Sequence, residues 1–218
     1  MYEWHPINTI LSVGFDLNSK LIDQIKTNFQ KKWPNSFDLP PHIGLILLPI
    51  SQSSYQPAFN EAIEFVNQWK TAKQLKIRQI IIEPTRDGAH FIKIALDLEW
   101  LIHQHNLLMD LLLKYRSQGL IRQKDFQRLT QNKFSPVEIE RLYQNGFIYS
   151  RDKYNPHITL GRISHTDWQD SLTQAIQNDT KELLNESIIL DQVHIIYHTD
   201  APVQTQMQII KRLDILLE

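Results

Sequence analysis

The sequence predicts an α+β fold built from a duplicated unit, and two observations support this. The first is a repeated pentapeptide: residues 41–45 read PHIGL and residues 156–160 read PHITL, with their histidines 115 residues apart. The second is that segments with strand alternation are interleaved with segments of helical periodicity along the whole chain. A second exact Pro-His-Ile-x-Leu arises by chance in about one chain in a thousand of this length, so duplication is the better explanation.

The expected elements follow from the apolar pattern and from the positions of helix caps and breakers. Alternating or short apolar runs predict strands over residues 9–16, 42–48, 75–83, 90–96, 157–163, 188–198 and 206–216. Helical spacing predicts helices over residues 19–32, 57–70, 98–116 and 166–184. Ser19 and Thr166 are the expected caps of the first and the last of these. Weaker helical patterns occur around Phe126 and over 136–143. Residues 34–41 are a loop rich in breakers, and the last two strands close the chain around Ala201 and Pro202.

The second half carries more chain before its motif than the first half does. Phe15 precedes His42 by 27 residues, whereas Leu96 precedes His157 by 61, an excess of 34 residues. We place this excess at about 117–150 and expect a helical insertion at the periphery, because repeats tolerate insertions at their surface. Residues 1–218 are otherwise expected to form a single domain.

Composition narrows the classes of function. The absence of cysteine excludes disulfides, thiolate metal sites and a cysteine nucleophile. The six glycines are not spaced as a dinucleotide fingerprint or a P-loop requires, and a net charge of −1 argues against bulk binding to duplex DNA. The first residues do not resemble a signal peptide, and no uncharged apolar run reaches 18 residues. We therefore expect neither export nor a membrane span, and a cytoplasmic location.

The two motifs place reactive side chains on strand faces. Side chains alternate along a strand, so His42 shares a face with Gly44, and His157 shares one with Thr159. Two lobes related by a pseudo-twofold axis bring both imidazoles to one cleft. One imidazole there acts as general base and the other as general acid in phosphoester chemistry, and the Thr159 hydroxyl donates to a phosphoryl oxygen.

The PHIGL and PHITLGR segments resemble the paired His-x-Thr/Ser motifs of the 2H phosphoesterase superfamily, which includes the 2′-5′ RNA ligase and cyclic-nucleotide phosphodiesterase families. The resemblance implies a bilobal fold of two pseudo-symmetric antiparallel sheets with flanking helices and a central cleft. It also implies metal-independent cleavage of 2′,3′-cyclic phosphates or 2′-5′ linkages, with no cofactor and with RNA ends or such nucleotides as partners. His42 and His157 are then the catalytic imidazoles and Thr159 a phosphate ligand, in a chain that we expect to be monomeric.

This chain departs from the family pattern in two ways. Gly44 stands where the family usually has Thr or Ser, and the insertion lengthens the usual spacing. Gly44 is either a degenerate position or one that lets a ligand approach the strand closely. A non-catalytic module that binds RNA ends or a nucleotide is therefore the alternative function. Tyr154, three residues before His157, is a second candidate for substrate contact, by stacking on a base or binding phosphate.

The other histidines give a weaker signal. His103 and His105 point about 200° apart on a helix, which argues against a shared metal ion. His194 and His198 share a strand face, but no third ligand is evident, so we expect a partly exposed pair. A zinc hydrolase that uses scattered histidines is the third hypothesis, and it predicts that a chelator abolishes activity.

Overall fold

The computed structural model describes residues 2–33, 41–85, 88–97, 99–199 and 209–217. The chain is mixed α+β, as predicted. Its strands are β1 (His5–Ile7), β2 (Thr9–Asp16), β3 (His42–Pro49), β4 (Lys73–Pro84), β5 (His90–Leu96), β6 (Leu120–Arg122), β7 (His157–Ile163), β8 (Ser187–Leu190), β9 (Gln192–Thr199) and β10 (Ile209–Leu216). Its helices are α1 (Lys20–Lys32), α2 (Tyr55–Val66), α3 (Glu99–Leu112), α4 (Gln123–Thr130), α5 (Pro136–Asn145) and α6 (Leu172–Thr180), with 3-10 turns η1 (Leu113–Tyr115), η2 (Arg151–Lys153) and η3 (Lys181–Asn185).

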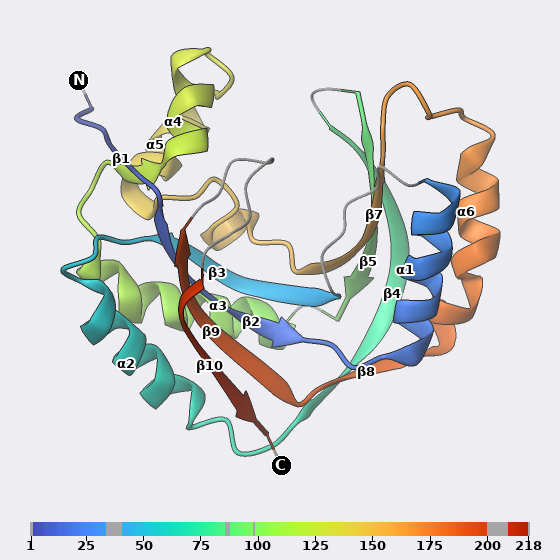
Figure 1. The fold of residues 1–218 in the computed structure, drawn as a ribbon, viewed down its shortest axis with the longest axis horizontal. Coiled ribbons are helices and arrows are strands. Elements are labelled where there is room, and N and C mark those ends of the chain that lie inside the picture. The colour runs from blue at the N-terminus through green and yellow to red at the C-terminus, as the bar shows by residue number, and fades with distance from the viewer. Residues whose placement is uncertain (1, 34–40, 86–87, 98, 200–208, 218) are drawn as a thin grey trace.

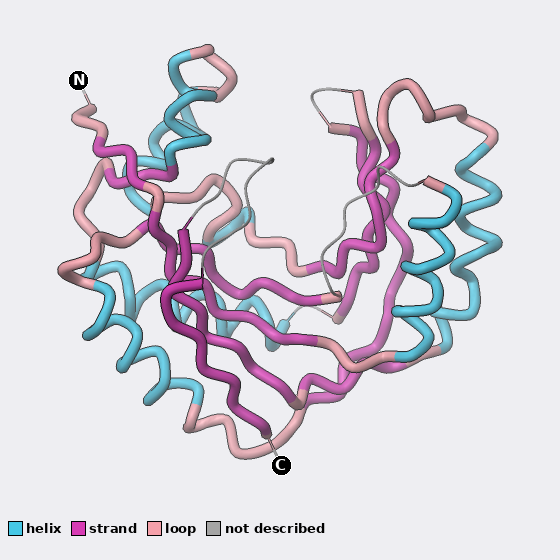
Figure 2. The backbone as a smooth tube through the Cα atoms, viewed as in Figure 1, coloured by secondary structure: helices cyan, strands magenta, loops and turns pink. Residues whose placement is uncertain are grey.

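Two four-stranded antiparallel sheets form the body of the molecule (Figures 1 and 2). The first has the order β10-β9-β2-β3 and the second the order β7-β5-β4-β8. Each motif strand, β3 or β7, is an edge strand that pairs with the strand before it in its repeat, β2 or β5. A later strand of each repeat also joins the other sheet. β4, from the first repeat, pairs with β5, and β9, from the second repeat, pairs with β2. This exchange interlocks the two halves and makes the sheets pseudo-symmetric.

Helices cover the outer face of each sheet (Figure 1). α2 and α3 pack against the first sheet, and α1 and α6 pack against the second. The Ser19 hydroxyl caps α1 by accepting the backbone N–H of Ile22 at 3.3 Å, as the sequence predicts. The sheet faces without helices, called the inner faces here, are turned toward each other (Figure 2). Among the described helices, none combines the length and the apolar composition needed to cross a bilayer.

One predicted strand is wrong, because residues 188–198 do not run as a single strand. They form β8 and β9, which are separated at Asp191 and belong to different sheets. The sequence remains rich in β-forming residues on both sides of Asp191. A local pattern does not show with which strand each part pairs. The predicted turn at Ala201 and Pro202, residues 206–208 and most of the 34–41 loop lie outside the described residues.

Three predicted helices have wrong limits, one of them the helix over 98–116, which is α3 only to Leu112 and continues as the 3-10 turn η1. Thr166 caps no helix, since the Ser164 hydroxyl accepts the Asp167 N–H at 3.2 Å and donates to its carboxylate at 2.6 Å, which closes a turn. α6 begins only at Leu172, and the 3-10 turn η3 replaces its predicted end. Likewise α2 begins at Tyr55 and ends at Val66, four residues before the predicted end.

Residues 117–150 contain β6, α4 and α5, which lie together at one end of the molecule (Figure 1). The two helices predicted here are present as α4 and α5, and the segment also contains β6, which pairs in parallel with β1. Ser135 and Glu138 form a complete capping box at the start of α5. At its other end the buried Arg116 guanidinium donates to the carbonyl of Leu142 at 3.1 Å. These contacts fasten the segment to the body without extending either four-stranded sheet.

Candidate active site

The two motif histidines begin the adjoining edge strands of the two sheets. His42 is the first residue of β3, His157 is the first residue of β7, and these two strands contact each other. Alternation buries Ile43 and Ile158 in the core and places both half-buried histidines on the inner faces. The imidazoles are close enough for the charge of His42 to lower the pKa of His157. The structure therefore brings together the two residues that the repeat singled out.

The imidazole of His157 is oriented by the backbone. Its Nδ1 lies 2.7 Å from the carbonyl oxygen of Asn155, and because a carbonyl only accepts, Nδ1 carries the proton. Burial lowers the pKa of His157, and the positive charges of Lys93 and His42 lower it further, while the Asn155 carbonyl and Glu83 act in the opposite direction. The neutral ring that results presents an unprotonated Nε2, which is the form that accepts a proton.

Lys93 is a candidate site residue that the sequence did not reveal. It lies on β5 directly opposite Thr159 of β7, so both side chains belong to the inner face of the second sheet. The ammonium is ion-paired with Glu83 of β4, and the Lys93 side chain is only 13% exposed. A hydroxyl beside an ammonium suits an anionic oxygen. Only strand pairing brings the two together, so no local sequence signal was available.

The corresponding position on the first sheet has no side chain. Gly44 of β3 pairs with Gly14 of β2, so two glycines stand where the second sheet has Thr159 and Lys93. A Cβ added to Gly44 meets no described atom within 4 Å, whereas one added to Gly14 collides with its surroundings. No atom of the described residues therefore fills the position above Gly44.

Tyr154 ties the two histidine strands together. Its hydroxyl donates to the carbonyl of Gly44 at 2.9 Å, and its ring stacks on His105 with centroids 4.0 Å apart. Burial raises the pKa of Tyr154, so the hydroxyl keeps its proton and remains a donor. The structure thus gives Tyr154 a structural contact, and contact with a substrate stays a prediction.

His105 completes this link from the middle of α3. Its Nδ1 lies 2.7 Å from the carbonyl oxygen of Leu45, and its Nε2 accepts the backbone N–H of Arg151 at 2.9 Å. Burial lowers the pKa of His105 to about 4, which keeps the ring neutral and in this one tautomer. His103, by contrast, lies on the same helix without this burial. His105 therefore has a structural role, whereas His103 lies on the surface of the helix.

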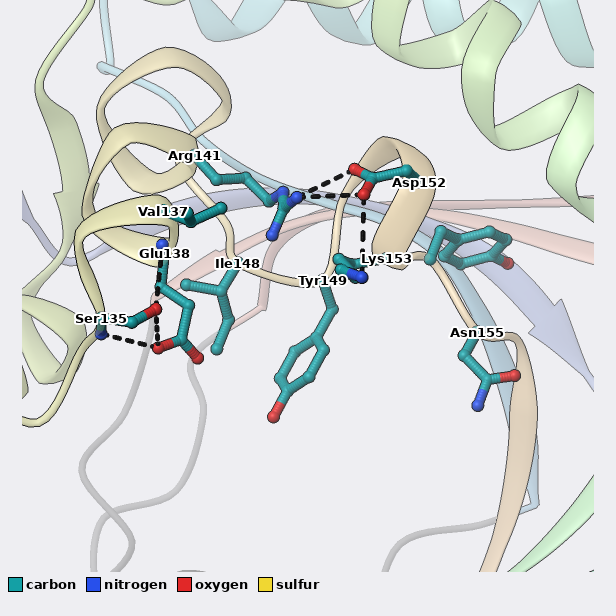
Figure 3. A pocket seen from close by; sticks show the side chains of 10 residues that line it. Ser135, Val137, Glu138, Arg141, Ile148, Tyr149, Asp152, Lys153 and Asn155 are labelled. Atoms are coloured by element: carbon teal, nitrogen blue, oxygen red, sulfur yellow. Dashed lines mark hydrogen bonds and ion pairs between the residues drawn. The ribbon is translucent and has the colours of Figure 1, made fainter.

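A groove lies between the insertion and the loop that leads into β7 (Figure 3). Its volume is about 570 Å³, and its walls come from α5, residues 148–149 and residues 152–155. Arg141 and Asp152 form an ion pair across it at 2.9 Å, and Tyr149 is 55% exposed beside it. Asn155, whose carbonyl holds His157, is one of the residues that line the groove, so the groove adjoins the histidine pair without containing it.

The histidines outside the motifs do not assemble a metal centre. Within the described residues, no group of three His, Asp or Glu side chains is placed to hold a metal ion. His194 and His198 are buried, with 7% exposure each, and not partly exposed as predicted. His194 is instead hydrogen-bonded through Nδ1 to Asp16 at 3.0 Å, and His198 lies against the carbonyl of Thr199.

Comparison with known proteins supports the fold. The sequence matches no family model and no curated protein. Among solved structures, TT0787 of Thermus thermophilus is 11% identical, with a TM-score of 0.55 over 96% of this chain and 99% of that one. E. coli LigT in complex with NADP+ is also 11% identical, with a TM-score of 0.50 over 97% and 99%. At such identities the likeness concerns architecture alone. The chain therefore shares the fold of these two proteins, and its two histidine motifs resemble those of the 2H phosphoesterase superfamily.

Proposed function

We propose that the protein is a metal-independent phosphoesterase that acts on 2′,3′-cyclic phosphate or 2′-5′ phosphodiester bonds of RNA or nucleotides. The observation that carries the proposal is the pairing of His42 and His157 on adjoining edge strands, linked through Tyr154. Two imidazoles on adjoining strands supply a general base and a general acid on either side of one phosphoryl group. The proposal also expects a cytoplasmic monomer.

The two histidines have different roles in this scheme. His157 is the base, because its Nδ1–H is committed to Asn155, its pKa is lowered, and Nε2 is left to take a proton from the attacking water. His42, in its protonated form, is the acid. As the water oxygen bonds to phosphorus, the bond to the ribose oxygen breaks, and that oxygen receives the proton from His42. Thr159 and Lys93 hold the non-bridging oxygens, where negative charge grows.

The surroundings of the pair support this substrate class. The groove beside Asn155 is lined by the exposed ring of Tyr149 and by Arg141 and Lys153, which are both ion-paired with Asp152. An aromatic face with nearby cations suits an unstacked base and its backbone, as at an RNA end. E. coli LigT, which has this fold, is complexed with NADP+, a ligand made of nucleotides.

The alternative is a binding module for RNA ends or a nucleotide, without turnover. It is favoured by Gly44, since one of the two hydroxyl donors of the family pattern is missing from an otherwise open position. The two functions differ in whether a bound cyclic phosphate is converted to product.

The deciding experiment supplies 2′,3′-cyclic mononucleotides and a 2′-5′-linked dinucleotide in the presence of a chelator and identifies the phosphate isomer formed. We expect turnover that His42→Ala and His157→Ala each reduce by about 10² to 10⁴, the usual contribution of a positioned acid or base. His103→Ala, which alters a histidine outside both motifs, is the matched control. Binding without turnover supports the alternative module, loss of activity in chelator supports a zinc hydrolase, and normal rates in both motif variants exclude the paired assignment.

A further inference from the structure

We propose that His194 of β9 supplies the phosphate contact that Gly44 lacks, by extending its Nε2 across Gly14 toward the open position on β3. The inference rests on the proposed function and adds to it a third imidazole, from outside both motifs. The ligand that His194 would bind is a phosphoryl group with anionic oxygens. Four observations carry it: strand register, the collision at Gly14, the polar network behind His194, and the contrast with the second sheet.

The strand register places His194 in one row with Gly44, the position on β3 that has no side chain. Gly44 of β3 pairs with Gly14 of β2, and Gly14 pairs with His194 of β9, so the three form one row across the sheet. All three lie on the inner face, because their neighbours Ile43 and Val193 are buried in the core. Neighbouring strands are about 4.8 Å apart. A side chain from β9 that crosses β2 therefore comes within reach of a group held above Gly44.

The imidazole does cross β2. A Cβ added to Gly14 lies 2.8 Å from Nε2 of His194 and 3.0 Å from its Cε1, which means that this edge of the ring lies over the Gly14 backbone. Glycine at position 14 is needed for that placement, since any side chain would displace the ring. A Cβ at Gly44, by contrast, would meet no atom of the described residues within 4 Å. Neither glycine therefore places a side chain between the His194 ring and the position above Gly44.

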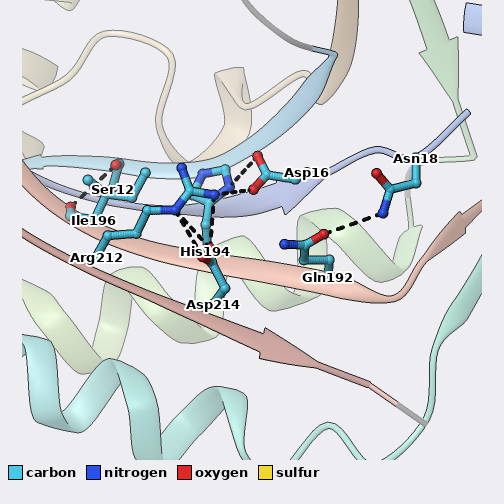
Figure 4. A network of polar contacts seen from close by, with 8 residues as sticks. All are labelled: Ser12, Asp16, Asn18, Gln192, His194, Ile196, Arg212 and Asp214. Atoms are coloured by element: carbon cyan, nitrogen blue, oxygen red, sulfur yellow. Dashed lines mark hydrogen bonds and ion pairs between the residues drawn. The ribbon is translucent and has the colours of Figure 1, made fainter. Parts of the chain in front are cut away.

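The other ring nitrogen is held by a network of charges (Figure 4). Nδ1 of His194 lies 3.0 Å from Asp16, and Arg212 of β10 donates to the other oxygen of that carboxylate at 2.5 Å. Asp214 in turn accepts from Arg212 at 2.9 Å. The hydrogen bond to His194 lowers the pKa of Asp16, and the charges of His194 and Arg212 add to this against partial burial. An ionised Asp16 holds one ring proton on Nδ1, so protonation of the ring places the second proton on Nε2 as a donor.

The two sheets differ in the side chains at the paired positions beside the motif histidines. There Thr159 and Lys93 occupy the paired positions and present a hydroxyl beside an ammonium. On the first sheet both positions are glycine, and the next strand contributes the imidazole of His194 instead. A phosphoryl group between the sheets then receives a donor from each side.

The test measures binding, so that it does not depend on turnover. Calorimetry with cytidine 2′-monophosphate should show affinity reduced about ten-fold or more in His194→Ala, since a hydrogen bond to a charged group contributes at least that factor. The matched control is His198→Ala, four residues along the same strand and equally buried. Unchanged affinity in His194→Ala overturns the inference. Binding that depends on His194 without any turnover overturns the proposed function instead, and an unaltered chain that binds no nucleotide overturns both.

Two further measurements separate phosphate binding from a structural role. In His194→Ala, adding Gly44→Thr should restore most of the affinity by supplying a hydroxyl from β3, whereas adding Gly44→Ala should not. In the ¹⁵N-labelled protein, inorganic phosphate should shift the Nε2 resonance of His194, assigned by its loss in His194→Ala. An Nε2 resonance that phosphate leaves in place overturns the inference even if the variant is unstable.

Discussion

The Tyr154 hydroxyl donates a 2.9 Å hydrogen bond to the carbonyl of Gly44, and so links the segment that leads into β7 with the strand that begins at His42. Gly44 follows His42 by two residues, and Tyr154 precedes His157 by three. This one hydrogen bond therefore helps to fix the distance between His42 and His157. The stacked ring of His105 supports it from α3 and is itself hydrogen-bonded to Leu45.

Tyr154→Phe removes this bond and keeps the stacking on His105. We expect the free energy of unfolding to fall by about 1 kcal/mol, the usual net value of one hydrogen bond, and turnover to fall because the two histidines lose a fixed separation. Urea unfolding and initial rates measure the two effects. Tyr149→Phe, at an exposed ring, is the control, and equal stability of both variants would contradict the role of the bond.

Thr159→Ala tests the hydroxyl donor of the second sheet. A donor aimed at an oxygen that gains charge in the transition state is worth on the order of 10² in rate. We expect that loss in kcat for a 2′,3′-cyclic nucleotide, with the fold unchanged by circular dichroism. Thr159→Ser keeps the hydroxyl and should keep most of the rate; if the Ser and Ala variants are equally slow, the hydroxyl is not the group that matters.

Gly44→Thr tests the open position on β3. The added side chain meets no described atom within 4 Å of its Cβ, and a strand accepts a β-branched residue, so the variant should fold normally. We expect turnover of cyclic phosphate to rise several-fold, because the new hydroxyl adds a donor from β3. Gly44→Ala adds bulk without a hydroxyl and should show no gain. Loss of activity in a folded Gly44→Thr protein would mean that the missing side chain makes room for substrate.

Lys93 and Glu83 should move the pH profile in opposite directions. Lys93 lowers the pKa of His157 and Glu83 raises it. With His157 as base, kcat/KM falls on the acid side as Nε2 becomes protonated. Lys93→Met should therefore move this acid limb to higher pH, and Glu83→Gln should move it to lower pH. Shifts in the same direction, or none, would contradict the assignment of His157 as the base.

His105 should make stability depend on pH. Its pKa is about 4 in the folded protein and ordinarily about 6.5, so between these values the unfolded chain binds more protons. The contribution of His105 is therefore complete above pH 6.5 and is lost progressively as the pH falls toward 4, by about 3 kcal/mol in total. Urea unfolding at about pH 7 and about pH 5, either side of the ordinary value, measures it. His105→Gln should weaken this dependence, and an equal slope in that variant would contradict the account.

Much of the fold was predictable because it is local. Alternating or short apolar runs predicted β2, β3, β5 and β7 almost to the residue, and Ser19 caps α1 as expected. The failures occurred where local signals are ambiguous. Thr166 has the chemistry of a cap, yet Ser164 closes a turn there first.

The sequence by itself determined the duplicated unit and the histidine pair, because the repeat of PHIGL in PHITL is visible without any partner strand. Tertiary structure decided what stands beside each histidine. Lys93 joins Thr159, and His194 joins Gly44, only through strand register, and Asp191 separates two strands that look like one. The physical reason is that a strand's pattern records which of its faces is buried, whereas the identity of its neighbour depends on contacts between residues far apart in the chain.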